Sequence, residues 1–301
     1  MFLMSGLIAM KIQTECVPCL LKRIIFESEQ ITDDKELQVK TLQNACNMLA
    51  KLYNPNSCSA CVATQVHRVA YDTLGTNDPY HELKRQSNEI ALKLVPLIEE
   101  KIKDSNDALK TSMLCSIIGN MMDFGIDGAS RHPKVINETF EKEYKNGIGH
   151  DDYNNLTELL EKAKNVVLFT DNCGEIVFDK ILCRELKKKY PDIFLTLVVK
   201  GKDILSDATM DDAVELGFDE VVDNIHTTGC FAVGVDFTKL PKPVEEELEK
   251  SDIIICKGMA NYEAFSETKY HPIAYLMRTK CNAIASSIGV KKDMNIIKLY
   301  P

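Results

Sequence analysis

LFTDNCGEIVFDK, residues 168–180, is the stretch that decides the fold. It begins as a run of apolar and β-branched residues, stops at Asp171 and Asn172, and continues after Gly174 with helical spacing. A buried strand that leads directly into an amphipathic helix is the first half of a βαβ unit. The stretch therefore raises a chemical question, because a carboxylate and a carboxamide stand side by side where the strand ends.

The rest of the C-terminal half continues this alternation. FLTLVVK (194–200), DEVVDN (219–224) and DIIICK (252–257) read as further strands, and DATMDDAVELG (207–217) as a helix. Before residue 164, apolar residues recur at i, i+3 and i+4 in one segment after another. We therefore expect an α/β protein, in which a Rossmann-like, mostly parallel sheet domain over residues 161–301 follows an all-helical N-terminal domain over residues 1–160.

Composition excludes several classes of protein. The net charge of −9 argues against a non-specific nucleic-acid binder, although a local basic pocket for a small anion remains compatible with it. No run of 18 apolar residues exists, so we expect no membrane span. Eleven cysteines in a chain of this kind predict a reducing cytoplasm. The apolar opening lacks the positive region of a secretory signal, and both Met1 and Met10 stay open as the start.

Polar residues follow the predicted strands at the edge where α/β sheets bind ligands. Asp171 and Asn172 follow the first strand, Asp207 lies beyond the second, and Lys257 ends the last. Carboxylate and amide oxygens suit Mg²⁺ or Mn²⁺, and a lysine ammonium suits phosphate. The alternative is that Asp171 and Asn172 cap the next helix, but capping accounts for only one of them. The chain lacks both the G-x-G-x-x-G turn and the phosphate loop, which disfavours a dinucleotide or ATP.

Four segments carry a resemblance to a known family. TDNCGEIVFD, SDATMDD, ICKGMANYEAFSE and LMRTKCNAIA occur in this order and resemble the damage-control phosphatase family, the domain of unknown function 89. CVPCLLKR and NDPYHELKRQSNEIA fit the branch that carries an N-terminal C-x-x-C. The resemblance implies a phosphatase that hydrolyses phosphomonoesters of small metabolites with a divalent metal (Mn²⁺, Ni²⁺, Co²⁺ or Mg²⁺). Its metal ligands map onto Asp171, Asn172 and Asp207, of which Asp171 and Asn172 are also the catalytic candidates.

The resemblance also implies a phosphate-binding set. Lys257, with Asn261 alongside, and Lys280 match the family's phosphate-binding positions, and Arg278 is a weaker candidate. KGMAN lacks an acidic residue after its glycine, and RTKC shortens the spacing between arginine and lysine, so the substrate stays open. The nucleophile is either a water molecule or the Asp171 carboxylate. Further residues that we expect near the cleft are Asn88, Asn120, Asp123 and the segment DFGIDGASRH (123–132).

Two C-x-x-C pairs form the other chemical feature. Cys16 with Cys19 and Cys58 with Cys61 supply the ligands of a structural Zn²⁺ site, although 38 residues between the pairs exceed the usual spacing. Reduced thiols or a facultative disulfide are the alternative. Cys173 stands at a helix start, where a thiolate would be favoured, but packing is the simpler role.

Two other functions compete with the phosphatase. A Rossmann-type methyltransferase would need the glycine-rich turn that this chain lacks. A non-enzymatic, metal-binding regulatory module would depend on the two C-x-x-C pairs instead. The substrate, the preferred metal and the oligomeric state stay open at this point.

Overall fold

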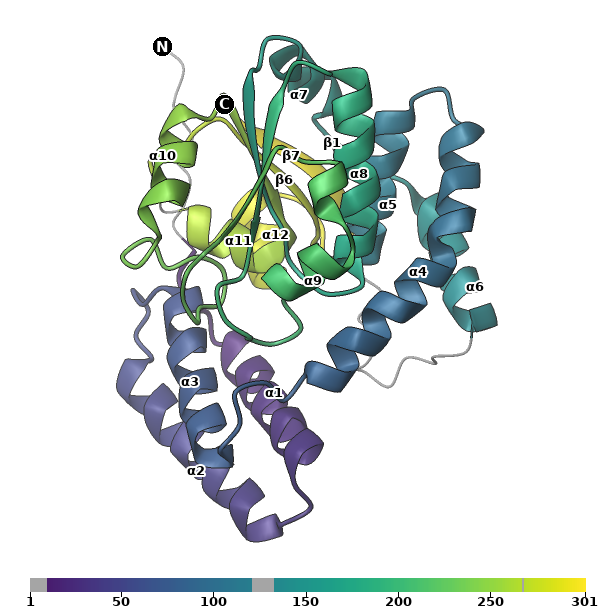
Figure 1. Ribbon diagram of the computed structural model, residues 1–301. Coiled ribbons are helices and arrows are strands. Elements are labelled where there is room, and N and C mark those ends of the chain that lie inside the picture. The colour runs from purple at the N-terminus through teal and green to yellow at the C-terminus, as the bar shows by residue number, and fades with distance from the viewer. Residues whose placement is uncertain (1–9, 121–132, 267) are drawn as a thin grey trace.

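The computed structural model describes residues 10–120, 133–266 and 268–301 (Figure 1). The described helices are α1 (Cys16–Ile31), α2 (Lys35–Leu52), α3 (Ser59–Leu74), α4 (His81–Lys103), α5 (Ala108–Gly119), α6 (Pro133–Asn146), α7 (Tyr153–Leu160), α8 (Glu175–Lys189), α9 (Met210–Glu215), α10 (Lys242–Lys250), α11 (Gly258–Phe265) and α12 (Asn282–Ile288). The described strands are β1 (His150–Asp151), β2 (Asn165–Phe169), β3 (Phe194–Val199), β4 (Asn224–Thr227), β5 (Ile253–Lys257), β6 (Ile273–Arg278) and β7 (Asn295–Tyr300).

The strands form one sheet in the order β1-β7-β6-β5-β2-β3-β4. Neighbouring strands are parallel except for β6 and β7, which pair antiparallel. Strand β2, which precedes Asp171, lies between β5 and β3. The expected α/β class with a mostly parallel sheet is confirmed, and the carboxyl ends of β2, β3 and β5 meet at one edge.

Two details of the expected sheet differ from the structure. The strand predicted at 219–224 lies at Asn224–Thr227, because Phe218–Glu220 form a 3-10 turn before it. Strands β1, β6 and β7 have no counterpart among the predicted strands. They extend the sheet beyond β5, so that β5 becomes an interior strand and Lys257 at its end is enclosed by neighbours.

Helices cover both faces of the sheet (Figure 1). One core is formed by α5, α7, α8 and α9 against one face, with Ile117, Leu156 and Ile176 among its buried side chains. The other core is formed by α10, α11 and α12, and includes Val244 and Phe265. This burial on both faces explains why the strands are almost continuously apolar.

The helical N-terminal half divides into two parts. Helices α1, α2 and α3 share a core of their own around Ile24, Ala45 and Val66. Helices α4, α5 and α6 pack instead on α8, where Phe140 and Phe178 meet edge to face. Helices α4 to α6 therefore belong to the layer that covers the sheet, and the domain boundary near residue 160 stays a prediction.

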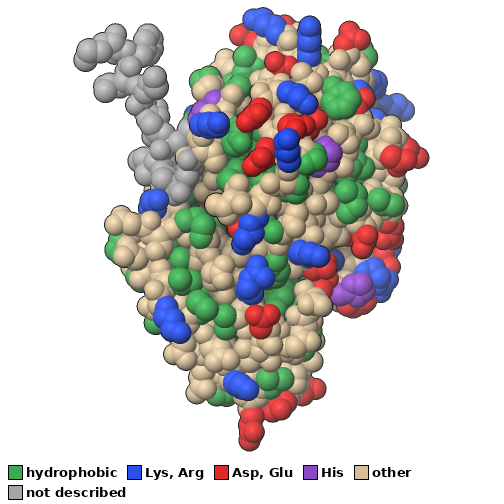
Figure 2. All heavy atoms as spheres, turned by 60° about the vertical axis from the view of Figure 1, so that its left-hand side comes forward, with side chains coloured by type: hydrophobic (Ala, Val, Ile, Leu, Met, Phe, Trp, Pro, Cys, Tyr) green, Lys and Arg blue, Asp and Glu red, His purple; other side chains and the backbone are tan. Residues whose placement is uncertain are grey.

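The surface carries both signs of charge. On the face drawn in Figure 2, Lys and Arg side chains are interspersed with Asp, Glu, hydrophobic and neutral side chains. Within the described residues, no helix combines the length and the apolar character that crossing a bilayer requires.

Candidate active site

The loop after β3 folds back onto the end of β2. The amide of Ala208 donates to the carbonyl of Asp171 at 2.8 Å, and the amide of Cys173 donates to the carbonyl of Ser206 at 2.7 Å. The Ser206 hydroxyl also donates to Asn172 Oδ1 at 2.7 Å. These bonds form a short antiparallel bridge that places Asp207 opposite Asn172. The three expected metal ligands are thus brought together by backbone pairing.

The Asp171 carboxylate is held by one of its two oxygens. Oδ2 accepts hydrogen bonds from Nδ2 of Asn120 at 2.7 Å and from Nδ2 of Asn172 at 2.8 Å. Gly258 lies so close that a Cβ built on it would be 1.8 Å from the same oxygen. No described residue donates a hydrogen bond to Asp171 Oδ1.

Asp207 has an oxygen that the protein does not satisfy. Its Oδ2 is buried and has no hydrogen-bond partner among the described residues, although Lys200 Nζ lies 3.3 Å away. Burial raises the pKa of Asp207, and Lys200 opposes that shift. Burial also raises the pKa of Asp171 well above its usual value, and the carboxylates of Asp207 and Glu175 raise it further. Both groups are therefore costly to ionise without an added cation.

Lys257 lies in a buried ion-pair cluster. Its ammonium pairs with Glu175, lies 2.8 Å from Asp179 Oδ1, and donates to the carbonyl of Ser116 at 3.3 Å. Burial by itself would lower the pKa of Lys257, but Asp179 and Glu175 raise it above its usual value. Burial raises the pKa of Asp179 to about 6. All three donors of the lysine have acceptors inside the protein, so a direct phosphate contact would require this cluster to open.

The buried charges do not balance. The carboxyl groups of Asp171, Asp207, Glu175 and Asp179 are all buried, and the buried ammonium groups facing them belong to Lys200 and Lys257. If all are ionised, two negative charges remain. Lys84 is also buried and acts on Asp207, but its charge is already paired with Asp78 and Asp203. The half-buried Lys280 acts on Asp171. Such an excess in a low-dielectric region is unfavourable unless a positive ligand joins it.

The donor set fits a hard divalent cation. Two carboxylates and one amide oxygen are the ligand types that Mg²⁺ and Mn²⁺ prefer. The described residues contain no group of three or more His, Cys, Asp or Glu side chains placed to hold a metal, so the third ligand here has to be the amide of Asn172. Asp207 Oδ2, which faces Lys200 without a hydrogen bond, and the excess of two negative charges favour a divalent ion over a monovalent one.

The remaining expected site residues lie around this centre. Lys280 donates through Nζ to the backbone carbonyl of Asn120, and it lowers the pKa of Asp171. Asn261 is fully buried and donates to the carbonyls of Thr170 and Lys257, both at 2.8 Å. It thereby joins the ends of β2 and β5. Asp123 and the segment 123–132 lie outside the described residues, as does Met1.

Asn88 contacts the loop after β2. Its Oδ1 accepts from the amide of Gly174 at 2.6 Å, and its Nδ2 donates to Asp212 Oδ1 at 2.9 Å. The Cys173 thiol lies 3.3 Å from the same Asp212 oxygen. Burial raises the pKa of Cys173 well above its usual value, which disfavours a thiolate and fits the packing role. Asn88 therefore ties helix α4 to the loop that carries Asp171 and Asn172.

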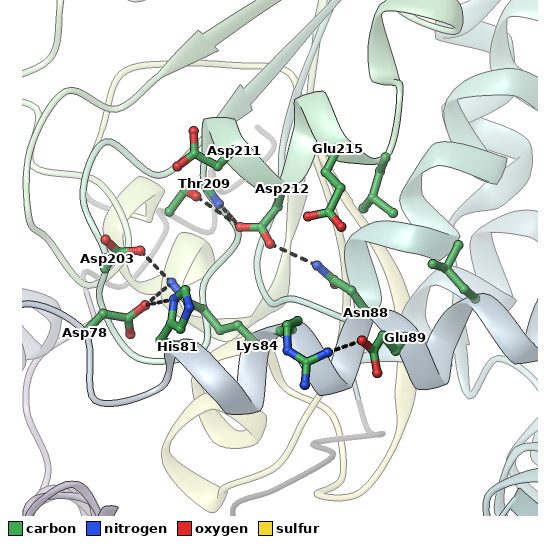
Figure 3. Close-up of a pocket in the computed structure, with 13 residues that line it drawn as sticks. Asp78, His81, Lys84, Asn88, Glu89, Asp203, Thr209, Asp211, Asp212 and Glu215 are labelled. Carbon is green, nitrogen blue, oxygen red and sulfur yellow. Dashed lines mark hydrogen bonds and ion pairs between the residues drawn. The ribbon is translucent and has the colours of Figure 1, made fainter. Parts of the chain in front are cut away.

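A cavity of about 600 Å³ borders this loop on the side of α4 and α9 (Figure 3). In it, Lys84 points towards Asp78 and Asp203 and pairs with both. Carboxylates outnumber basic groups on its walls, which disfavours a phosphate there. Its charged lining residues are Asp78, His81, Lys84, Arg85, Glu89, Asp203, Asp211, Asp212 and Glu215.

The two C-x-x-C pairs do not form a metal site in the described residues. All eleven cysteines are thiols. The Sγ of Cys16 accepts from the amide of Gln13 at 3.4 Å, and the Sγ of Cys58 accepts from the amide of Cys61 at 3.2 Å. The Cys58 sulfur thereby caps the start of α3. Among the described residues, Cys16, Cys19, Cys58 and Cys61 are not placed as a group that could hold zinc.

Sequence reasoning did not assign Glu175, Asp179 or Ser116 to the site. Glu175 and Asp179 are four residues apart on α8, so they lie on one face of the helix. Two acidic residues on the buried side of an otherwise apolar helix face are the signal that could have found them. Ser116 on α5 donates to Asp179 Oδ1 at 2.6 Å.

Comparison with known proteins gives a consistent result. The family model described as the damage-control phosphatase ARMT1-like domain matches residues 12–296. A damage-control phosphatase of Archaeoglobus fulgidus is 38% identical over 96% of this chain and 99% of the relative. A damage-control phosphatase of Pyrococcus horikoshii is 33% identical over 94% of this chain and 96% of the relative. The crystal structure of a domain-of-unknown-function-89 protein from Pyrococcus horikoshii superposes with a TM-score of 0.88 at 30% identity, covering 97% of this chain and all of that one.

Proposed function

Because this chain belongs to the family of damage-control phosphatases with the ARMT1-like domain, we propose that it hydrolyses phosphomonoesters of small metabolites with the help of a divalent metal ion. The observation that carries the metal dependence is the backbone bridge that joins Asp171 and Asn172 to Asp207. The buried excess of two negative charges around it supports the same conclusion.

Asp171, Asn172 and Asp207 would hold the cation, with Asp171 Oδ1 and Asp207 Oδ2 as the oxygens not engaged by hydrogen bonds from described residues. A cation bound there would draw charge from the phosphoryl oxygens. Lys280 would bind the substrate phosphate from the other side, because its ammonium lies beside Asn120 at the same sheet edge.

We assign indirect roles to Lys257, Asn261 and Asn88. Lys257 would act as the buried counter-charge of Glu175 and Asp179. Asn261 would keep the ends of β2 and β5 together, and Asn88 would clamp the amide of Gly174. A direct contact with substrate stays a prediction, for Lys257 and Asn261 from the family resemblance and for Asn88 from its place on a helix that could cover the site.

Hydrolysis of p-nitrophenyl phosphate tests this function. The purified chain should release p-nitrophenol with Mn²⁺, Co²⁺, Ni²⁺ or Mg²⁺, and EDTA should stop the reaction reversibly. Asp171→Ala should lose turnover while its circular dichroism spectrum stays that of the wild type. Binding of Mn²⁺ without any turnover would favour the metal-binding regulatory module instead. A screen of phosphorylated sugars, nucleotides and cofactor fragments would then identify the substrate class.

A further inference from the structure

We propose that Asn120 is a positioning residue for the cation site, and that Glu175 acts on the site through Asn120. The inference rests on the proposed function, because it concerns how the proposed ligand Asp171 is held. Asn120 at the end of α5 and Glu175 on α8 are buried polar residues that we do not propose as metal ligands or as substrate contacts.

The Asn120 side chain is fully committed to two carboxylates. It is buried at the end of α5, and its Nδ2 donates to Asp171 Oδ2 at 2.7 Å and to Glu175 Oε2 at 2.6 Å. A carboxamide has two N–H groups, so each carboxylate receives one of them. The rotation of this amide is therefore fixed by Glu175 on one side and by Asp171 on the other.

This arrangement selects which oxygen Asp171 presents. Oδ2 accepts from Asn120 and from Asn172, so its lone pairs are directed at the protein. Oδ1 receives no hydrogen bond from a described residue, so it is the oxygen that we propose for the cation. Residues that orient a metal ligand through hydrogen bonds contribute to metal affinity even though they do not touch the ion.

Glu175 can perform this task because Lys257 compensates its charge. A second carboxylate beside Asp171 would otherwise repel it and would not stay ionised in a buried place. Lys257 pairs with Glu175 Oε1, which leaves Oε2 for Asn120. Asp179, held by Ser116, occupies another donor of the lysine. The chain of contacts runs from Lys257 to Glu175, to Asn120, and to Asp171.

Asn120 also reaches the proposed phosphate-binding group. Its backbone carbonyl accepts from Nζ of Lys280. One residue at the end of α5 therefore contacts a proposed cation ligand through its side chain and the proposed phosphate-binding lysine through its backbone. Only the side-chain contact can be removed by substitution, so the test concerns that contact.

Mn²⁺ binding measured by electron paramagnetic resonance of the free ion tests the inference without using activity. Asn120→Ala should raise the Mn²⁺ dissociation constant about 10- to 100-fold, as is typical when a residue that orients a ligand is lost. Its kcat with p-nitrophenyl phosphate should recover as the Mn²⁺ concentration is raised, whereas Asp171→Ala should stay inactive.

Asn295→Ala is the matched control, because Asn295 is also buried and donates to the carbonyl of Gly147, at 3.1 Å. It should lower the melting temperature and leave Mn²⁺ affinity unchanged.

A double-mutant cycle tests whether Glu175 acts through Asn120. Glu175→Gln should weaken Mn²⁺ binding in the wild-type background and have little further effect in the Asn120→Ala background. Equal effects in both backgrounds would mean that Glu175 acts by its charge or through the Asn172 amide, which lies 3.5 Å from Oε2, and would overturn the inference. If Asn120→Ala does not fold, Asn120→Ser takes its place, because a hydroxyl has a single donor hydrogen and cannot bridge two carboxylates.

The two proposals fail in different ways. Wild-type protein that does not bind Mn²⁺ would overturn the proposed metal site, and the inference with it. Wild-type protein that binds Mn²⁺, together with an Asn120→Ala variant that binds it equally well, would overturn only the role of Asn120.

Discussion

Lys257 Nζ and Asp179 Oδ1 lie 2.8 Å apart, and neither side chain has exposed surface. The lysine that the family resemblance assigns to the phosphate is thus enclosed by protein carboxylates. If Lys257 neutralises buried carboxylates, removing it should lower stability. If it contacts the phosphate, removing it should raise KM, so experiment can separate the two roles.

Lys257→Met should lower the free energy of unfolding by about 3–5 kcal/mol, because it removes one partner of a buried ion-pair cluster. Urea denaturation followed by circular dichroism measures this loss. Lys291→Met, at an exposed lysine, is the control and should change little. If Lys257→Met keeps the stability of the wild type but has a raised KM, Lys257 binds the phosphate instead.

Gly258→Ala should weaken Mn²⁺ binding, because the new Cβ would lie 1.8 Å from Asp171 Oδ2 and displace that carboxylate. The backbone also contributes, since Gly258 has φ of +74°. Gly75→Ala separates the two effects. Gly75 has φ of +69° and nothing within 4 Å of its added Cβ, so that variant should lose only about 1–2 kcal/mol of stability. Equal losses of stability in the two variants, with Mn²⁺ affinity retained in both, would contradict the close approach.

Lys280→Gln should raise the KM for p-nitrophenyl phosphate and the inhibition constant of inorganic phosphate about 10- to 100-fold, which is the effect of losing a hydrogen bond to a charged group. Its Mn²⁺ affinity should not fall, because a positive charge near Asp171 has been removed. Steady-state kinetics at saturating Mn²⁺ measure the change, with Lys292→Gln as the exposed control. If inorganic phosphate inhibits Lys280→Gln with the same inhibition constant as the wild type, Lys280 does not bind the phosphate.

Glu263→Gln should raise the melting temperature at pH 8 but not at pH 5. Burial raises the pKa of Glu263 to about 7, and a hydrogen bond from Ser59 offsets part of that shift. The folded chain thus holds this proton more tightly than the unfolded chain. The side chain costs stability above pH about 7, and that cost fades as the pH falls towards 4.5, the ordinary value for glutamate.

Glu249→Gln, at an exposed glutamate, is the control for Glu263→Gln. The thiols of Cys16 and Cys281 lie near Glu263. Burial and the Glu263 carboxylate both raise their pKa values above the ordinary 9.0, so they do not titrate between pH 5 and pH 8. A melting-temperature gain that is equal at pH 5 and pH 8 would contradict the raised pKa.

The parts of the fold that sequence could predict depend on local pattern. The β2 run, the break at Asp171 and the helix after Gly174 are adjacent in the chain, so periodicity and turn chemistry reveal them together. IAYLMR (273–278) and NIIKLY (295–300) are short apolar runs that periodicity alone does not separate from helix, and they were not predicted as strands.

The parts of the site that sequence could not predict depend on contacts between distant segments. Asn120 and Asp171 are 51 residues apart, and Lys257 and Glu175 are 82 apart. Nothing local to Lys257 distinguishes a lysine that binds a phosphate from one that neutralises carboxylates. Only the packing of α5 and α8 around the end of β5 makes that distinction.

The return of the 200–209 loop onto the end of β2 has a consequence for folding. The proposed cation ligands Asp171 and Asp207 meet only after β3 has paired with β2, and Asn120 joins them only after α5 has docked. An unfolded or partly assembled chain would therefore offer Mn²⁺ no comparable partner. Added Mn²⁺ should then raise the melting temperature of the α/β body with the logarithm of its concentration, which makes the ion a probe of complete assembly as well as the proposed cofactor.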